Sequence, residues 1–233
     1  MVYSRLLTGM HPMKLLSVNV GSRRTQIKGS EIETTGIYKT PVSEPVDISM
    51  LGIPGDFICD QKDHGGPDQA VYMYGSLDYD WWAQELGRSL APGTFGENLT
   101  VEDLESARLH IGDRLRVGTA LLEVTAPRIP CSTLAARMRD LKFAKKYRDA
   151  ERPGLYCRVL EAGTVRAGDE VTHVAGEGER VSALEMFRFH YQREKDEPTL
   201  RRILRAPISI RARKDLESDL RRLLASEQSE GRQ

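Results

Sequence analysis

Residues 111–138 read IGDRLRVGTALLEVTAPRIPCSTLAARM, and this stretch decides the fold class. Two short apolar or alternating runs, ARLHIGDRLRVG (107–118) and ALLEVTAP (120–127), follow one another with glycine at the junction, which is typical of two strands joined by a tight turn. Two prolines then end the second run, because proline fixes φ and donates no ladder hydrogen bond. The residues that follow Cys131 are good helix formers. The stretch therefore predicts two strands that lead through a rigid corner into a helix.

The same pattern of short apolar runs punctuated by turn residues extends over most of the chain. We expect further strands in KLLSVNV (14–20), TGIYKTPV (35–42) and YCRVLEAGTV (156–165). Two segments favour helices instead: LDYDWWAQEL (77–86), which ends at Gly87, and STLAARMRDLKFAKKYRD (132–149). The sequence thus predicts an α+β domain over residues 14–174, a β-barrel with flanking helices.

The character of the chain changes after the linker-like GEGER segment (176–180). Ser182 and Glu185 form a possible capping box before a helical run. EPTLRRILRA (197–206) is a second short helix candidate. In the last stretch Leu216, Leu220, Leu223 and Leu224 fall on one helical face. We therefore predict a small three-helix unit at residues 181–225.

The composition is that of an ordinary globular protein. Of 233 residues, 39% are hydrophobic and 29% are charged, and 34 Lys and Arg balance 34 Asp and Glu. A net charge of zero argues against nucleic acid, whose binders usually carry a basic excess. We find neither a membrane span nor a signal peptide. Three irregularly spaced cysteines do not indicate a disulfide framework, so we expect free thiols and a cytoplasmic protein.

Cys131 is the strongest candidate for a reactive group. Its thiol would lie in a proline-flanked turn at the start of a helix, whose partial positive charge favours a thiolate. Arg128 adds a full charge nearby. A thiolate serves both as a nucleophile and as a ligand for a soft metal. The alternative is that Cys131 is a small buried apolar residue, as a lone cysteine usually is.

Two further loops are candidates for ligand binding. In residues 55–71, Gly65 and Gly66 next to His64 would let the backbone approach an anion, and Asp56 begins the segment. A solvated turn is the alternative, and the spacing fits no standard zinc pattern. In PGTFGENLT (92–100), Asn98 can both donate and accept hydrogen bonds, which suits a pterin edge, although a plain hairpin loop is also possible.

Some residues are interpreted as structural and others as possible anion ligands. Asp113 and Asp169 follow glycine before a strand, and we expect them to cap turns. The remaining histidines show no common site. Basic residues near the loops are candidates to offset the charge of a phosphate-bearing cofactor: Arg23, Arg24, Lys39, Arg128 and Arg158.

Taken together, seven segments in order resemble the MOSC family, named for the C-terminal domain of molybdenum-cofactor sulfurase. The resemblance covers about residues 36–170 and is closest to the bacterial stand-alone, YiiM-like branch linked to 6-N-hydroxylaminopurine resistance. The segments are TGIYKTPV, GIPGDFICDQKDHGGPDQAVYMY, YDWW, PGTFGENLT, IGDRLRVG, APRIPCSTLAARM and GLYCRVLEAGTVRAGD. The C-terminal helices resemble the three-helix domain that often follows in this branch.

The resemblance implies a β-rich barrel that binds a molybdenum cofactor (molybdopterin), with Cys131 as the expected metal ligand. It implies reduction of hydroxylaminopurines, hydroxylamines or amidoximes, with electrons from a separate flavin or haem reductase. Pyridoxal phosphate binding is a further association. On this basis Cys131, His64 and Asp56 are the expected catalytic residues. The expected cofactor-binding residues are Arg128, Asn98, Arg158, Gly65, Gly66 and Arg24.

Three questions stay open at the level of sequence. One is whether Cys157, next to Arg158, places a second thiol near the pocket. The chain is expected to act as a monomer or a homodimer, without membrane or nucleic acid. The alternative functions are a sulfur carrier that uses a Cys131 persulfide, and a binding module for nucleotide or RNA supported by the Arg-rich C-terminal helices.

Overall fold

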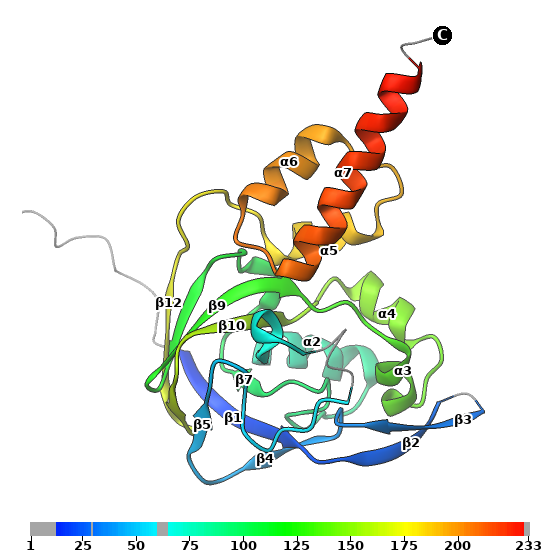
Figure 1. Ribbon diagram of the computed structural model, residues 1–233. Coiled ribbons are helices and arrows are strands. Elements are labelled where there is room, and N and C mark those ends of the chain that lie inside the picture. The colour runs from blue at the N-terminus through cyan, green and yellow to red at the C-terminus, as the bar shows by residue number, and fades with distance from the viewer. Residues whose placement is uncertain (1–12, 29, 60–64, 231–233) are drawn as a thin grey trace, which may run out of the picture.

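The computed structural model describes residues 13–28, 30–59 and 65–230. Its centre is a closed barrel of seven strands, because β12, at one end of the sheet, also pairs with β1, seven strands along (Figure 1). All neighbours are antiparallel except one parallel pair, β6 and β7. In barrel order the strands are β12 (Glu170–Val174), β8 (Arg114–Val117), β9 (Ala120–Pro127), β10 (Leu155–Glu161), β6 (Val71–Gly75), β7 (Leu99–Val101) and β1 (Met13–Gly21). The α+β barrel expected from the sequence is confirmed.

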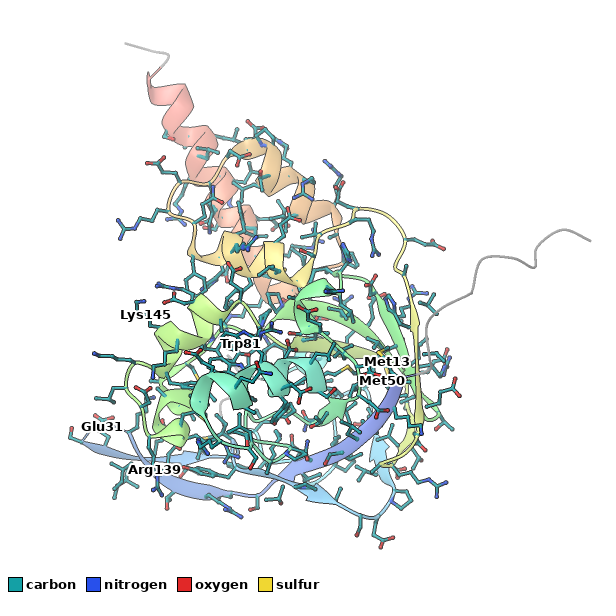
Figure 2. All side chains as sticks on the ribbon, turned by 180° about the vertical axis from the view of Figure 1, so that it is seen from behind. Met13, Glu31, Met50, Trp81, Arg139 and Lys145 are labelled. Atoms are coloured by element: carbon teal, nitrogen blue, oxygen red, sulfur yellow. The ribbon has the colours of Figure 1, made fainter. Side chains whose placement is uncertain are left out.

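Smaller strand pairs lie outside the barrel. β4 (Lys39–Val42) pairs with β1, and β5 (Val46–Ile48) pairs with β11 (Gly163–Val165). β2 (Arg24–Lys28) and β3 (Glu31–Thr35) form a separate hairpin. The sequence analysis did not predict this hairpin, because its strands are polar and largely exposed. The tip residue Glu31 lies on the same side of the molecule as Arg139, and α3 packs against β2 (Figure 2).

Three helices flank the barrel: α2 (Ser76–Leu86), α3 (Ser132–Met138) and α4 (Phe143–Ala150). α2 ends as predicted at Gly87, which adopts the left-handed conformation. The single helical run expected over 132–149 is wrong, since it is divided between α3 and α4. Arg139 is left-handed (φ 54°), and the Asp140 carboxylate accepts the Lys142 N–H at 2.9 Å, a local bond that competes with helix continuation.

An aromatic layer packs the helices against the barrel. Trp82 is fully buried and its ring lies 5.1 Å from that of Phe143 and 5.7 Å from that of Phe95. The Trp82 indole N–H donates to the hydroxyl of Tyr74 at 2.9 Å. Trp81 packs partly buried beside it. Both tryptophans therefore pack α2 against its neighbours.

The three C-terminal helices stand together at one end of the barrel (Figure 1). They are α5 (Ala183–Tyr191), α6 (Glu197–Arg205) and α7 (Ile210–Glu230). Ser182 caps α5 as predicted, because its side chain accepts the Glu185 N–H at 3.0 Å. No helix in the described part of the chain is long and apolar enough to cross a membrane.

Candidate functional site

Cys131 lies on the wall of a cavity at the corner between β9 and α3. It is the N-cap residue of α3 and is partly buried, so its thiol is not sealed inside the core. The cavity has a volume of about 380 Å³. We call it the cationic cavity, and Cys131 shares its wall with Arg128, Lys39, Asp56 and Asn98. Four of the expected site residues therefore meet at one place.

Asp56 organises the polar side of the cationic cavity. Its carboxylate forms a buried ion pair with Lys39, accepts the Gly21 N–H at 2.7 Å and accepts the Asn98 side-chain N–H at 2.9 Å. Asn98 is itself fixed, because its carbonyl accepts the Tyr72 N–H at 3.1 Å. Asp56 is thus held by three donors, and its predicted role in proton delivery stays a prediction.

Two buried cations supply the charge of the cavity. Burial lowers the pKa of Lys39, and the attraction of Asp56 counteracts it. Burial by itself would lower the pKa of Arg128, but the hydroxyl groups of Tyr156 and Tyr72 raise it above its usual value. The Arg128 guanidinium donates to the Phe95 carbonyl and lies 5.0 Å from the Tyr72 ring centre. Its Nε has no hydrogen-bond partner among the described residues.

The glycine-rich loop 92–100 is held rigidly behind Asn98. Glu97 is fully buried and accepts the Gly93 N–H at 2.6 Å and the Tyr79 hydroxyl at 2.5 Å. Burial raises the pKa of Glu97, and these hydrogen bonds counteract it. From α3, Arg137 donates to the Gly93 and Thr94 carbonyls at 3.0 and 2.6 Å. The loop is therefore a fixed wall of the site.

The sequence profile of the MOSC domain matches residues 60–172. The protein YflK of Bacillus subtilis is 35% identical over 191 residues, which cover 82% of this chain and 86% of YflK. The chain belongs to the MOSC domain family. YiiM of Escherichia coli is 33% identical over 141 residues, 59% of this chain and 62% of YiiM, so the match spans less than two thirds of that relative.

Other matches agree with this assignment. A Gibberella moniliformis protein named "Reductase" is 34% identical over 165 residues, 69% of this chain but only 29% of that longer protein. The crystal structure of YiiM from Geobacillus stearothermophilus superposes with a TM-score of 0.75 at 28% identity, over 90% of this chain and all of that one. The structure of Escherichia coli YiiM, at 24% identity and a TM-score of 0.69, covers 90% of this chain and 91% of its own and shares the fold.

Several expected site residues of this MOSC chain lie elsewhere. His64 is outside the described residues. Gly65 and Gly66 are described but do not line the cationic cavity, and Gly66 has the expected positive φ of 92°. Arg24 is exposed and lies 5.8 Å from the Tyr38 ring centre, away from the cavity wall. Their predicted contact with a cofactor stays a prediction.

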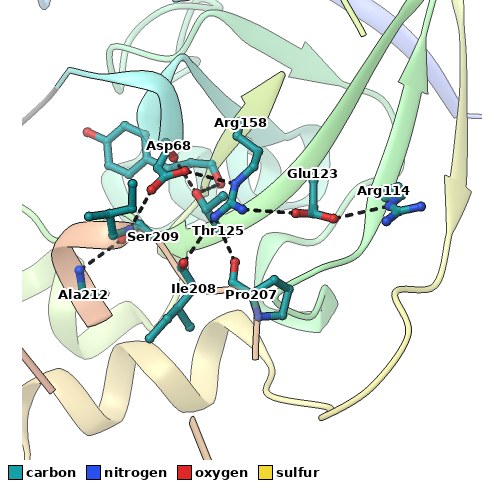
Figure 3. A network of polar contacts seen from close by, with 11 residues as sticks. Asp68, Arg114, Glu123, Thr125, Arg158, Pro207, Ile208, Ser209 and Ala212 are labelled. Carbon is teal, nitrogen blue, oxygen red and sulfur yellow. Dashed lines mark hydrogen bonds and ion pairs between the residues drawn. The ribbon is translucent and has the colours of Figure 1, made fainter. Parts of the chain in front are cut away.

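Arg158 does not reach the cationic cavity. It follows Tyr156 by two residues on β10 and is bound by other groups. Its guanidinium pairs with Asp68 at 3.1 Å and donates to the carbonyls of Pro207 and Ile208 at 3.1 and 3.2 Å (Figure 3). In this MOSC protein Arg158 therefore joins the barrel to the start of α7.

The cysteines of the MOSC chain differ in environment. Cys157 is fully buried, and burial raises the pKa of its thiol to about 12. It does not line the cationic cavity, so the sequence-level possibility of a second thiol there is wrong for this residue. Cys59 is exposed and does line the cavity. Cys157 belongs to the buried core of the barrel, whereas Cys59 lies at the surface.

Two histidines that the sequence left without a common site converge on Asp113. His173 Nε2 and His110 Nδ1 lie 3.0 and 3.8 Å from its carboxylate, and Arg180 pairs with it at 2.6 Å. Asp113 also accepts the His110 N–H at 2.9 Å, which confirms its role in capping the turn. The cluster fastens the linker after β12 to the barrel of the MOSC chain, and it is remote from Cys131 in sequence and contacts.

The three arginines of α6 are occupied by ion pairs. Arg201 pairs with Glu197 at 2.6 Å and Arg205 with Glu179 at 2.8 Å. Arg202 pairs with Glu185 on α5. Because these charges are neutralised within the chain, they add little to a surface for RNA.

Proposed function

We propose that this chain binds a molybdenum cofactor in the cationic cavity, with Cys131 as the protein ligand of the metal. With electrons from a separate flavin or haem reductase it reduces N-hydroxylated compounds. The observation that carries the proposal is the position of Cys131, whose thiol shares one cavity with two buried cations. The name of the Gibberella relative is consistent with a reductase of this family.

The residues of the cavity fit such a group. Sulfur is a soft donor that suits molybdenum, and within the described residues no cluster of three or more His, Cys, Asp or Glu is placed to hold a metal ion by itself. A metal at Cys131 therefore needs most of its ligands from a cofactor. Arg128 and Lys39 supply positive charge for a phosphate-bearing pterin, and the buried Arg128 Nε lacks a partner that a ligand acceptor would provide.

The molybdenum–pterin group supplies the two-electron chemistry when bound. The overall reaction is R–NHOH plus two electrons and two protons, giving R–NH₂ and water. The chain positions the reactants and handles protons. Burial raises the pKa of Tyr156 while Arg128 opposes this, so the hydroxyl stays protonated and is a hydrogen-bond donor at the cavity wall. Asn98, fixed by Asp56 and Tyr72, presents a hydrogen-bonding edge.

The sulfur-carrier alternative also uses Cys131, but the cavity favours a larger group. A persulfide adds one sulfur atom, whereas the cationic cavity holds about 380 Å³, within the size range of small-molecule and cofactor sites. We therefore place cofactor binding first.

The test compares Cys131→Ser with Cys59→Ser, because both thiols line the same cavity. Each full-length variant is produced in a host with intact cofactor synthesis and analysed for molybdenum and pterin. Reduction of 6-N-hydroxylaminopurine is followed with a flavin reductase as donor. Cys131→Ser should lower activity by more than the roughly 10- to 100-fold that loss of a supporting residue costs at a metal site. Cys59→Ser should retain activity.

Equal metal content and equal activity in wild type and Cys131→Ser would overturn the proposal. A wild-type protein without molybdenum or pterin that gains one sulfur on Cys131 after incubation with a cysteine desulfurase would instead support the carrier function. Mass spectrometry of the intact chain detects that adduct.

A further inference from the structure

A second cavity lies beneath the C-terminal helices, on the other side of Cys131. Its volume is about 330 Å³, and we call it the apolar cavity. It lies between the corner after β9 and the helices α5 and α7. Gln69, Cys131 and Tyr156 belong to the walls of both cavities. Cys131 thus stands where two compartments of different character meet.

Apolar side chains form two facing parts of the wall of this second compartment. Pro127, Ile129 and Pro130 face it from the barrel corner. Opposite them are Phe189 of α5 and Leu216 of α7. These apolar surfaces suit a planar apolar body, while the charged lining residues Lys195, Arg211 and Asp215 come from the helix side.

Polar groups stand at the edge of the apolar cavity. The side-chain carbonyl oxygen of Gln69 is buried and has no hydrogen-bond partner among the described residues, so a ligand N–H would satisfy it. Lys195 and Asp215 add a donor and an acceptor at the helix side. Burial lowers the pKa of His190, and the nearby charge of Lys195 lowers it further, so this ring is a neutral donor or acceptor.

A hydrogen-bond network joins the barrel wall of the apolar cavity to the wall formed by α7. Asp68, the neighbour of Gln69, accepts the Ile210 N–H at the start of α7 at 2.6 Å. Two bonds nearby, Ser209 N–H to the Thr125 carbonyl at 3.1 Å and Ala212 N–H to the Ser209 hydroxyl at 3.3 Å, fix the first turn of α7 on the barrel (Figure 3). The C-terminal helices are therefore a fixed part of this cavity.

We propose that the apolar cavity binds the planar heteroaromatic body of an N-hydroxylated substrate and places its N–OH group at the junction beside Cys131. This inference rests on the proposed function. It assigns substrate selection to the C-terminal helices and cofactor binding to the barrel side. Hydroxylamine itself has no ring system that could occupy the apolar cavity. Its reduction should therefore not depend on binding in that cavity.

The test fills the cavity with Ala212→Phe, since Ala212 lines it from α7. Lys214→Phe, at an exposed position on the same helix that does not line the cavity, is the matched control. The ratio of kcat/KM for 6-N-hydroxylaminopurine to that for hydroxylamine should fall by about tenfold or more in Ala212→Phe, the scale of steric discrimination in an apolar pocket. The control should keep the wild-type ratio.

A binding measurement is independent of turnover. The fluorescence anisotropy of 2-aminopurine, a planar amine that is not an N-hydroxyl substrate, is titrated with each full-length protein. Ala212→Phe should raise its dissociation constant about tenfold or more. Gln69→Leu should also weaken binding, because it removes the buried acceptor. This second variant serves where Ala212→Phe does not fold.

An unchanged substrate ratio together with unchanged 2-aminopurine affinity would overturn the inference. Equal losses for both substrates would overturn it as well, since they would indicate damage to the reacting centre. Failure of the proposed function is recognised separately by the absence of molybdenum and pterin and by an inert Cys131→Ser change. In that case 2-aminopurine binding still reports whether the apolar cavity takes a planar base.

Discussion

Replacing Arg158 by alanine should weaken the attachment of the C-terminal helices to the barrel. The guanidinium donates to two carbonyls just before α7, and it pairs with Asp68 at 3.1 Å and with Glu123 at 3.6 Å (Figure 3). The side chain is 27% exposed, so these contacts are mostly shielded from water. Asp68 keeps its bond from Ile210 N–H in the variant and is not left alone.

The magnitude follows from the contacts that are lost. Charge-assisted hydrogen bonds contribute about 1.5–3 kcal/mol when shielded, and we take about 1 kcal/mol for each carbonyl bond to allow for the exposed part. About 1 kcal/mol more comes from the two ion pairs. The free energy of unfolding should therefore fall by about 3 kcal/mol, and Tm by roughly 6–12 °C for a chain of this size.

Urea unfolding at fixed pH and salt measures the change in Arg158→Ala. Arg166→Ala is the control, because Arg166 is 69% exposed and lies 3.6 Å from Asp169, so its loss should change stability by no more than about 0.5 kcal/mol. Limited proteolysis of segment 175–180 should be faster in Arg158→Ala alone. Equal unfolding free energies in the two variants would refute the reasoning, since the network would then add nothing to the attachment.

Two further predictions concern the same end of the molecule. Ser182→Ala removes the acceptor for the Glu185 N–H and should lower the unfolding free energy by about 1 kcal/mol. Ser182→Thr keeps a hydroxyl acceptor and should preserve the unfolding free energy. Urea unfolding compares the two variants, and an equal loss of stability in both would contradict a capping role. Burial opposes the charge on Asp113, but hydrogen bonds from His173 and Arg180 hold its pKa well below the usual range. The stability that this carboxylate contributes is therefore present above its unfolded pKa of about 3.9 and is lost as the pH falls. The difference in unfolding free energy between wild type and Asp113→Asn should narrow below about pH 4. A constant difference from about pH 7 to about pH 3 would contradict this role of Asp113.

Local sequence was sufficient to predict the corner at Cys131. Two prolines end β9, and Cys131 begins α3, so the thiol is placed by the chain on either side of it. Asn98 was also found, because a polar amide in a glycine-rich loop indicates a built turn. In both cases neighbours along the chain fix the backbone.

Other residues of the site gave no comparable signal. Lys39 was only one of several basic candidates, and its ion pair with Asp56 crosses 17 residues of sequence. Arg137 lies in an ordinary helical run, yet it binds the loop 43 residues earlier. Arg158 was a candidate because a basic residue near the loops could offset the charge of a phosphate-bearing cofactor, and only the position of α7 shows its contacts with the chain before that helix.

By itself the sequence determined the strand-and-turn alternation, the corner at Cys131, the three C-terminal helices and the family. These follow from dihedral preferences and short-range periodicity, which act between neighbouring residues. The tertiary structure alone decided which charges meet: Lys39 and Arg128 at the cavity, Arg158 at α7, and both histidines at Asp113. Closing the barrel brings segments together that are distant in the sequence. Their charged side chains then pair, because a buried charge is stable only next to an opposite charge or a hydrogen-bonding group.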